Sequence, residues 1–237
     1  MMLLPTDLRI ATIPIRENGD PLIDVREEGR IAIGPSPEVP NNHDYYFLRK
    51  TVYEKLLQAQ SLLPSGLHFC LYEGYRSLKL QQRLFEDRLA VIQQHHPDWS
   101  YEQQFLETHQ MVAPTVNLDG SQNIPSHATG GAIDVYLIDE KGNAVDMGIH
   151  PKDWLLDHDG SLSLPDSKRI SAEAKQYRSI MSHILQQVGF VNLATEYWHW
   201  SYGDRYWACY LGKPAAFMDF KKDKKCKRML CIIKNEM

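Results

Sequence analysis

Residues 127–138 read His-Ala-Thr-Gly-Gly-Ala-Ile-Asp-Val-Tyr-Leu-Ile, and this stretch decides the fold. Its last seven residues form an apolar run that is interrupted by one carboxylate, which predicts a buried strand over residues 132–138. A charge flanked by Ile133 and Val135 is costly to bury unless it is paired or bound to a metal. The two glycines allow a tight turn, so the chain can fold back and bring His127 close to Asp134.

A second segment, Glu196-Tyr-Trp-His199-Trp, offers another imidazole and another carboxylate. Its aromatic content predicts a strand. On a regular strand, residues three apart point to opposite faces, so a bulge or a strand end is needed if Glu196 and His199 serve one site. The alternative is a half-buried aromatic strand with a structural histidine and an exposed glutamate.

The two segments together have the composition of a catalytic metal site. Catalytic zinc commonly takes three protein ligands of nitrogen and oxygen type and leaves its fourth position for water. A carboxylate held outside the ligand set can then take a proton from that water. If the segments meet in space, the pattern predicts a metal-dependent hydrolase. If they do not meet, no stoichiometric metal is expected.

Arg76 lies in the turn Glu73-Gly-Tyr-Arg76, after a predicted buried strand over residues 67–72. Functional groups often sit in such turns. A guanidinium there can stabilise the oxyanion that forms when water attacks a carbonyl, or it can bind a substrate carboxylate. The alternative is an ordinary surface ion pair.

The composition is that of a globular protein without a global charge signal. The chain has 237 residues, 43% of them hydrophobic, and a net charge of -4, so nothing points to nucleic acid or to a membrane surface. The first residues lack the pattern of a secretory signal, so we expect a cytoplasmic protein. The four cysteines form no C-x-x-C pair and are expected to be free thiols.

Hydrophobic periodicity and turn signals predict helices first and strands late, without strict alternation. Helices are expected over residues 48–63, 77–95, from 100 onward, and 171–188, and further strands over residues 190–193 and 197–202. This order favours an α+β fold with a central antiparallel sheet flanked by helices. The expected organisation is an irregular N-terminal segment (1–40) packed on the domain, a single domain (41–215), and a basic tail (216–237).

The combined motifs resemble a known family. The pattern His127-x-x-Gly-x-Ala-x-Asp134, followed by Glu196-x-Trp-His199, is similar to the signature of the zinc D,D-peptidases, and most similar to the D-alanyl-D-alanine dipeptidases among them. The Glu-Gly-Tyr-Arg-Ser segment that begins at Glu73, the chain length and the stretch 134–148 with its Asp-Met-Gly end support this resemblance. The similarity covers residues 40–205.

The resemblance implies a role for each matching residue. It implies that one zinc ion per chain is bound by His127, Asp134 and His199. It further implies a general base that later donates the proton to the leaving amine (Glu196), a group that stabilises the tetrahedral intermediate (Arg76), and a contact to the substrate's amino or carboxylate end (Ser126). The implied reaction is hydrolysis of D-alanyl-D-alanine to two D-alanines, with a small dipeptide as the partner.

Three residues beside Ser126 depart from the family pattern and leave substrate binding there open, namely Pro125, Ala128 and Thr129. Two other functions stay possible. One is a D,D-carboxypeptidase or endopeptidase acting on longer cell-wall peptides, which an open groove would favour, whereas an unextended cavity favours the dipeptidase. The other is a non-catalytic zinc domain, which would be expected to have lost Glu196 or Arg76.

Overall fold

A computed structural model describes residues 3, 6–35, 42–157 and 159–221. Its centre is a five-stranded sheet in the order β2-β4-β5-β7-β6. The strands are β2 (Ala32–Ile33), β4 (His68–Glu73), β5 (Ala132–Ile138), β7 (Glu196–Ser201) and β6 (Val191–Leu193). Every neighbouring pair is antiparallel except β2 with β4, which is parallel. The prediction of an α+β fold with a central, mainly antiparallel sheet is confirmed.

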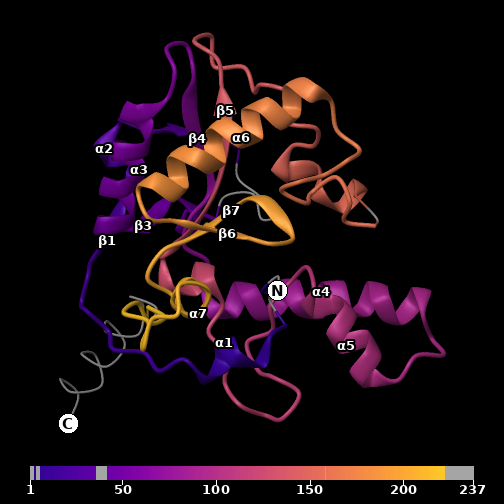
Figure 1. The fold of residues 1–237 in the computed structure, drawn as a ribbon. Helices are drawn as coiled ribbons and strands as arrows, with labels where there is room; N and C mark the ends of the chain where they lie inside the picture. Colours follow the sequence, from indigo (N-terminus) through magenta and orange to yellow (C-terminus); the bar gives the residue numbers. More distant parts are fainter. Residues whose placement is uncertain (1–2, 4–5, 36–41, 158, 222–237) are drawn as a thin grey trace, which may run out of the picture.

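Helices flank the sheet on both sides (Figure 1). On one side, α3 (Lys50–Leu62) and α6 (Ala172–Gln187) pack against each other and against the sheet. On the other side, α4 (Leu78–His95) and α5 (Tyr101–His109) form a helical pair. The shorter helices are α1 (Leu8–Thr12), α2 (Val25–Glu28), α7 (Arg205–Tyr210) and the 3-10 turns η1 (Asp44–Tyr46), η2 (Ser126–Thr129) and η3 (Pro151–Leu156).

Three of the longer helices begin where the sequence signals place them, whereas α3 begins at Lys50 instead of residue 48 because residues 47–49 form strand β3. The side chains of Ser77, Ser100 and Ser171 each cap a helix by accepting a hydrogen bond from a backbone N–H of the first turn. Ser100 and Gln103 form the predicted capping box. These starts confirm the helices predicted over 77–95, from 100 onward and over 171–188, because caps are local features that short sequence patterns encode.

The largest hydrophobic core lies between the sheet and the α3–α6 layer. All seven residues of β5 are buried, as expected for the middle strand of the sheet. Ile133 and Val135 belong to the same cluster as Leu56 of α3 and Met181 of α6. Strand side chains alternate between faces, so Asp134 projects on the opposite side, toward α4. The core therefore fixes the strand that carries Asp134.

The N-terminal segment contains short regular elements within the part expected to be irregular. β1 (Leu22–Asp24) pairs with β3 (Phe47–Arg49) in a separate two-stranded ribbon, and β2 adds an edge strand to the central sheet. These strands have two or three residues each, too few to show a hydrophobic period in the sequence.

Arg49, at the end of β3, connects an N-terminal residue and a C-terminal residue to η2. Its fully buried guanidinium pairs with Glu17 at 2.7 Å and donates to the carbonyl oxygens of Thr129 and Asp219, both at 2.6 Å. Burial in a protein interior demands such full pairing of a charge. Because Thr129 ends η2, this network also holds the turn that carries His127.

Most of the predicted basic tail, from residue 222 onward, lies outside the described residues, as do Cys226 and Cys231. The two cysteines within them, Cys70 and Cys209, are free thiols. Among the described segments, no helix combines the length and the apolar character needed to cross a membrane.

Candidate functional site

Three neighbouring strands place acidic and imidazole side chains in one row. In the antiparallel register, Glu73 of β4 lies opposite Asp134 of β5, and Asp134 lies opposite His199 of β7. Directly opposed residues of an antiparallel pair project on the same face of the sheet. The pairing of the strands therefore brings residues from three distant parts of the sequence to one spot.

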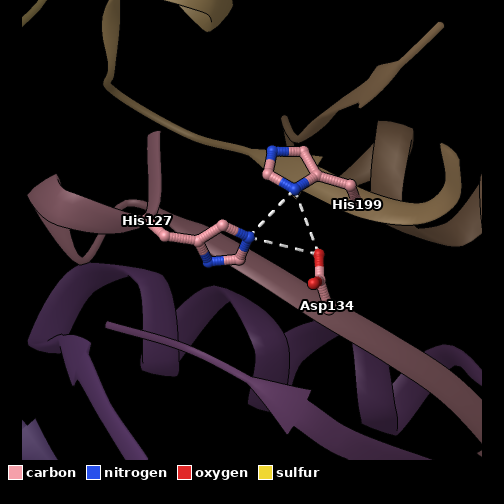
Figure 2. Close-up of side chains that lie close together, drawn as sticks. All are labelled: His127, Asp134 and His199. Carbon is pink, nitrogen blue, oxygen red and sulfur yellow. Dashed lines mark hydrogen bonds and ion pairs between the residues drawn. The ribbon is translucent and has the colours of Figure 1, made fainter. Parts of the chain in front are cut away.

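His127 reaches the same spot from η2, and the two sequence segments meet (Figure 2). His127 Nε2 lies 3.1 Å from His199 Nδ1 and 3.4 Å from Asp134 Oδ1, and His199 Nδ1 lies 3.0 Å from the same carboxylate oxygen. All three residues are buried. The possibility that the segments stay apart is excluded by this geometry.

The three atoms fit a tetrahedrally coordinated zinc ion. Ligand bonds of about 2.0–2.1 Å in a tetrahedron place neighbouring ligand atoms about 3.3 Å apart, and the observed separations are 3.0–3.4 Å. Asp134 Oδ1 is buried and has no hydrogen-bond partner. A buried carboxylate oxygen in this state is costly, and a cation among the three atoms would compensate it. Two imidazoles and one carboxylate are ligands that zinc accepts.

The hydrogen bonds around the histidines leave the inward nitrogens available for a metal. His127 Nδ1 lies 2.7 Å from the carbonyl oxygen of Gly74, which can only accept, so this nitrogen carries the proton and Nε2 keeps its lone pair. His199 presents Nδ1 to the cluster, while its Nε2 lies 3.5 Å from Ser201 Oγ. Partners of this kind are typical of metal-binding histidines.

The diglycine turn is required by the local geometry. Gly130 ends η2 in the left-handed region, with a φ of 70°. A Cβ on Gly131 would lie 2.6 Å from the carbonyl oxygen of Tyr202, closer than packed atoms come. Thr129, one of the departures from the family pattern, accepts a hydrogen bond from the Gly131 N–H and donates one to the Ser126 carbonyl. The departure at this position thus stabilises the turn.

Glu196 faces the site because β7 is irregular. The three-residue spacing of Glu196 and His199 required such an irregularity if both were to face one site. In the pairing of β6 with β7, Asn192 is opposite Trp200, but the next residue, Leu193, is opposite Glu196. Three β7 residues therefore have no partner in β6 and form a bulge. The side-chain amide of Asn192 donates hydrogen bonds to the backbone carbonyls of residues 196, 197 and 199 in this bulge. Glu196 and His199 both line the same cavity as a result.

The surroundings of the site shift the pKa values of Asp134 and Glu196 in opposite directions. Burial raises the pKa of Glu196 to about 7, although the charge of His199 opposes the rise. Burial also acts to raise the pKa of Asp134, but His127 and His199 outweigh it and the pKa is lowered. Burial acts to lower the pKa of His127, but the charges of Asp134 and Glu73 raise it. Asp134 therefore stays ionised while Glu196 can exchange a proton near neutral pH.

Arg76 lies at the edge of this cluster as half of a buried ion pair, not a surface one. Its Nε and Nη2 donate to the two carboxylate oxygens of Glu73 at 2.5 and 2.6 Å, and its Nη1 donates to Gln81 Oε1 at 3.0 Å. Sequence reasoning missed the positioning roles of Glu73 and Gln81. Only the strand register and the start of α4 bring these two residues beside Arg76, and neither is visible in a local pattern.

A cavity of about 320 Å³ opens over the cluster, between the sheet and the α4–α5 pair. The predicted site residues all line it: Arg76, Ser126, His127, Asp134, Glu196 and His199. Its walls also contain Leu84, Val112, Pro151, Trp154 and Trp198. A mostly apolar cavity with a few convergent polar groups is the usual form of a small-molecule site.

An α+β fold that presents two histidines, an aspartate and a nearby glutamate in one cavity defines the class of zinc-dependent hydrolases. Comparison with known sequences then specifies the family. The model of the D-ala-D-ala dipeptidase family matches residues 41–223, and the chain belongs to this family. The resemblance drawn from the motifs is confirmed, and with it the prediction of a zinc peptidase.

Two curated relatives are similar to the chain. A D-alanyl-D-alanine dipeptidase of Synechocystis sp. is 30% identical over 223 residues, which covers 83% of this chain and 87% of the relative. A D-alanyl-D-alanine dipeptidase of Escherichia coli is 31% identical over 135 residues, 57% of this chain and 55% of the relative.

Among solved structures, the chain has a partial likeness to a variant of the vancomycin-resistance D,D-pentapeptidase VanY in complex with Zn(II), with a TM-score of 0.41 and 14% identity over 76% of this chain and 86% of the other. A likeness to the LD-carboxypeptidase LdcB has a TM-score of 0.42 and 14% identity, over 82% of this chain and 72% of the other.

Proposed function

We propose that this protein hydrolyses D-alanyl-D-alanine to two D-alanines as a zinc-dependent dipeptidase. The observation that carries the proposal is the convergence of His127, Asp134 and His199 in one cavity with Glu196 beside them. Membership of the D-ala-D-ala dipeptidase family and the printed activity of both relatives support the choice of substrate.

Each residue has a proposed part in the reaction. His127, Asp134 and His199 hold the zinc, which when bound supplies a Lewis acid that polarises a carbonyl and makes water acidic. Glu196 takes a proton from the attacking water and later gives it to the leaving amine, which suits a carboxyl whose pKa burial raises to about 7.

Arg76 and Ser126 have proposed roles toward the substrate. The Arg76 guanidinium, held in place by Glu73, stabilises the negative charge that develops on the carbonyl oxygen. Ser126 lies on the cavity wall next to His127 and contacts the amino or carboxylate end of the dipeptide. The apolar walls of the cavity exclude water from this chemistry, which strengthens the electrostatic interactions inside it.

The presence of both Glu196 and Arg76 at the cluster argues against a non-catalytic zinc domain. The deciding experiment measures D-alanine release from D-alanyl-D-alanine by zinc-loaded protein, with L-alanyl-L-alanine and chelator-treated protein assayed in parallel. We expect rapid, D-selective release that chelation abolishes. No release from the D-dipeptide by protein with one bound zinc per chain would refute the proposal.

A further inference from the structure

The cavity is longer than the proposed dipeptide. Five residues of α4 line it at helical spacing, so one face of the helix forms a wall: Gln81, Leu84, Asp87, Arg88 and Val91. Gln81 marks the metal end, because it accepts a hydrogen bond from Arg76. At 1.5 Å per residue, Arg88 lies about 10 Å and Val91 about 15 Å further along the helix. An extended dipeptide spans about 7 Å.

Arg88 supplies a cation to this distal part of the cavity. Its Nε is buried and has no hydrogen-bond partner, and its Nη2 lies 3.5 Å from the sulfur of Met111, a weak acceptor. Within the part of the chain that the structure describes, no carboxylate pairs with the Arg88 guanidinium. The nearby Asp87 is paired with Arg83, at 3.6 Å. A guanidinium on a cavity wall that lacks a carboxylate partner is costly, and an anionic ligand in the cavity would supply that partner.

Arg88 and Asp87 are the charged side chains of α4 on the distal lining, and Asp87 is 67% exposed and paired with Arg83, so Arg88 is the cation available to a ligand. Residues 109–113 also line the cavity, and this segment runs alongside α4, where the Gln81 amide donates to the Ala113 carbonyl. His109 is half-buried there, and burial lowers its pKa to about 4, so it is neutral near pH 7. Leu155 of η3 and Val91 are apolar neighbours on the cavity lining.

We propose that the distal end of the cavity is a subsite for a carboxylate that the substrate carries on the side chain of its leaving residue or on a residue beyond it, with Arg88 as its partner. This inference rests on the proposed function and extends its substrate class toward longer substrates, which a cavity longer than a dipeptide favours. The carboxylate has two possible sources. It belongs either to the side chain of a larger leaving residue, as in D-alanyl-D-glutamate, or to the C-terminus of a third residue, as in tri-D-alanine.

The experiment compares substrate pairs that differ only in this charge. D-alanyl-D-glutamate is matched with D-alanyl-D-glutamine, and tri-D-alanine with its C-terminal amide. For each pair, the ratio of kcat/KM is measured in the wild-type protein, in Arg88→Met and in Arg83→Met. Arg83 is a suitable control because it lies on the same helix, is 69% exposed and does not line the cavity; its substitution also unpairs Asp87 and so tests whether that carboxylate affects the ratio.

We expect the wild-type protein to prefer the charged member of one pair by about ten- to hundredfold, the value of a charge-assisted hydrogen bond. Arg88→Met should bring that ratio close to one, and Arg83→Met should keep it. The pair that shows the preference identifies the source of the carboxylate. A wild-type ratio near one in both pairs, or a preference that survives Arg88→Met, would overturn the inference.

The outcome is separable from the proposed function. Hydrolysis of D-alanyl-D-alanine without any charge preference removes the subsite and leaves the dipeptidase intact. If D-alanyl-D-alanine is not hydrolysed, the subsite is tested by binding of the same pairs to zinc-free protein. Binding is monitored by the fluorescence of Trp154 and Trp198 on the cavity wall. Equal affinities within each pair in that titration would overturn the subsite as well.

Discussion

Replacing Arg178 by methionine should destabilise the protein strongly, although this arginine is remote from the metal ligands in sequence. Arg178 lies on α6, is only 3% exposed, and donates to the carbonyl oxygens of Met147, Leu162 and Leu164 at 2.6–2.8 Å. Its guanidinium also stacks on Tyr197, 3.8 Å from the ring centroid. Arg178 therefore connects residues 147, 162 and 164 to α6 through hydrogen bonds and contacts β7 through Tyr197.

The size of the effect follows from these contacts. Methionine preserves most of the volume but leaves three carbonyl groups unsatisfied, at about 1–3 kcal/mol each. Burial of the Arg178 charge is itself unfavourable and lowers the pKa of Arg178 to about 10. Methionine removes this cost, which offsets part of the lost stability. We expect a net decrease of about 3–5 kcal/mol in the free energy of unfolding, the range for breaking a buried charge network.

Chemical denaturation of zinc-free protein measures this decrease. Arg169→Met is the matched control, since Arg169 flanks the same segment and forms an exposed ion pair with Asp159, for which about 1 kcal/mol or less is expected. The activity should fall too, because Tyr197 directly follows Glu196 and donates its hydroxyl to the Ile149 carbonyl. A stability loss in Arg178→Met no larger than in the control would refute the reasoning.

Four further outcomes test the site. Glu196→Gln should keep its zinc, measured by elemental analysis, and lose about 10²–10⁴-fold in kcat/KM; near-normal turnover would contradict its role. A base acts when deprotonated, so wild-type kcat/KM should fall as pH drops through the pKa of Glu196, which burial raises to about 7. This fall should be missing from the residual rate of Glu196→Gln. His199→Ala should lose the metal, and full zinc occupancy would show that it is not a ligand. Gly131→Ala should weaken zinc binding, because the new Cβ would push the turn away from the Tyr202 carbonyl; unchanged affinity would show that the turn tolerates the shift.

The parts of the fold that were predictable depend on neighbours in sequence. β5 begins and ends where its apolar run does, and the serine caps fix the helix starts. The two-residue strand Ala32–Ile33 was not predictable, because its place at the sheet edge depends on pairing with Cys70 and Leu71, almost forty residues away. Arg49 and Arg178 are likewise buried only by tertiary structure, whereas arginines in a sequence are ordinarily expected at the surface.

The residues of the candidate site were predictable from their local motifs, whereas their convergence depends on the strand register, which no local pattern shows. A one-residue slip between β5 and β7 would turn His199 to the opposite face and separate it from Asp134. The core fixes this register, since Ile133 must stay on the side of α3 and α6. The same alternation that buries the apolar residues thus aligns Glu73, Asp134 and His199 across three strands. The bulge in β7 departs from that alternation, and it allows Glu196 to face the same cavity as His199, three residues away.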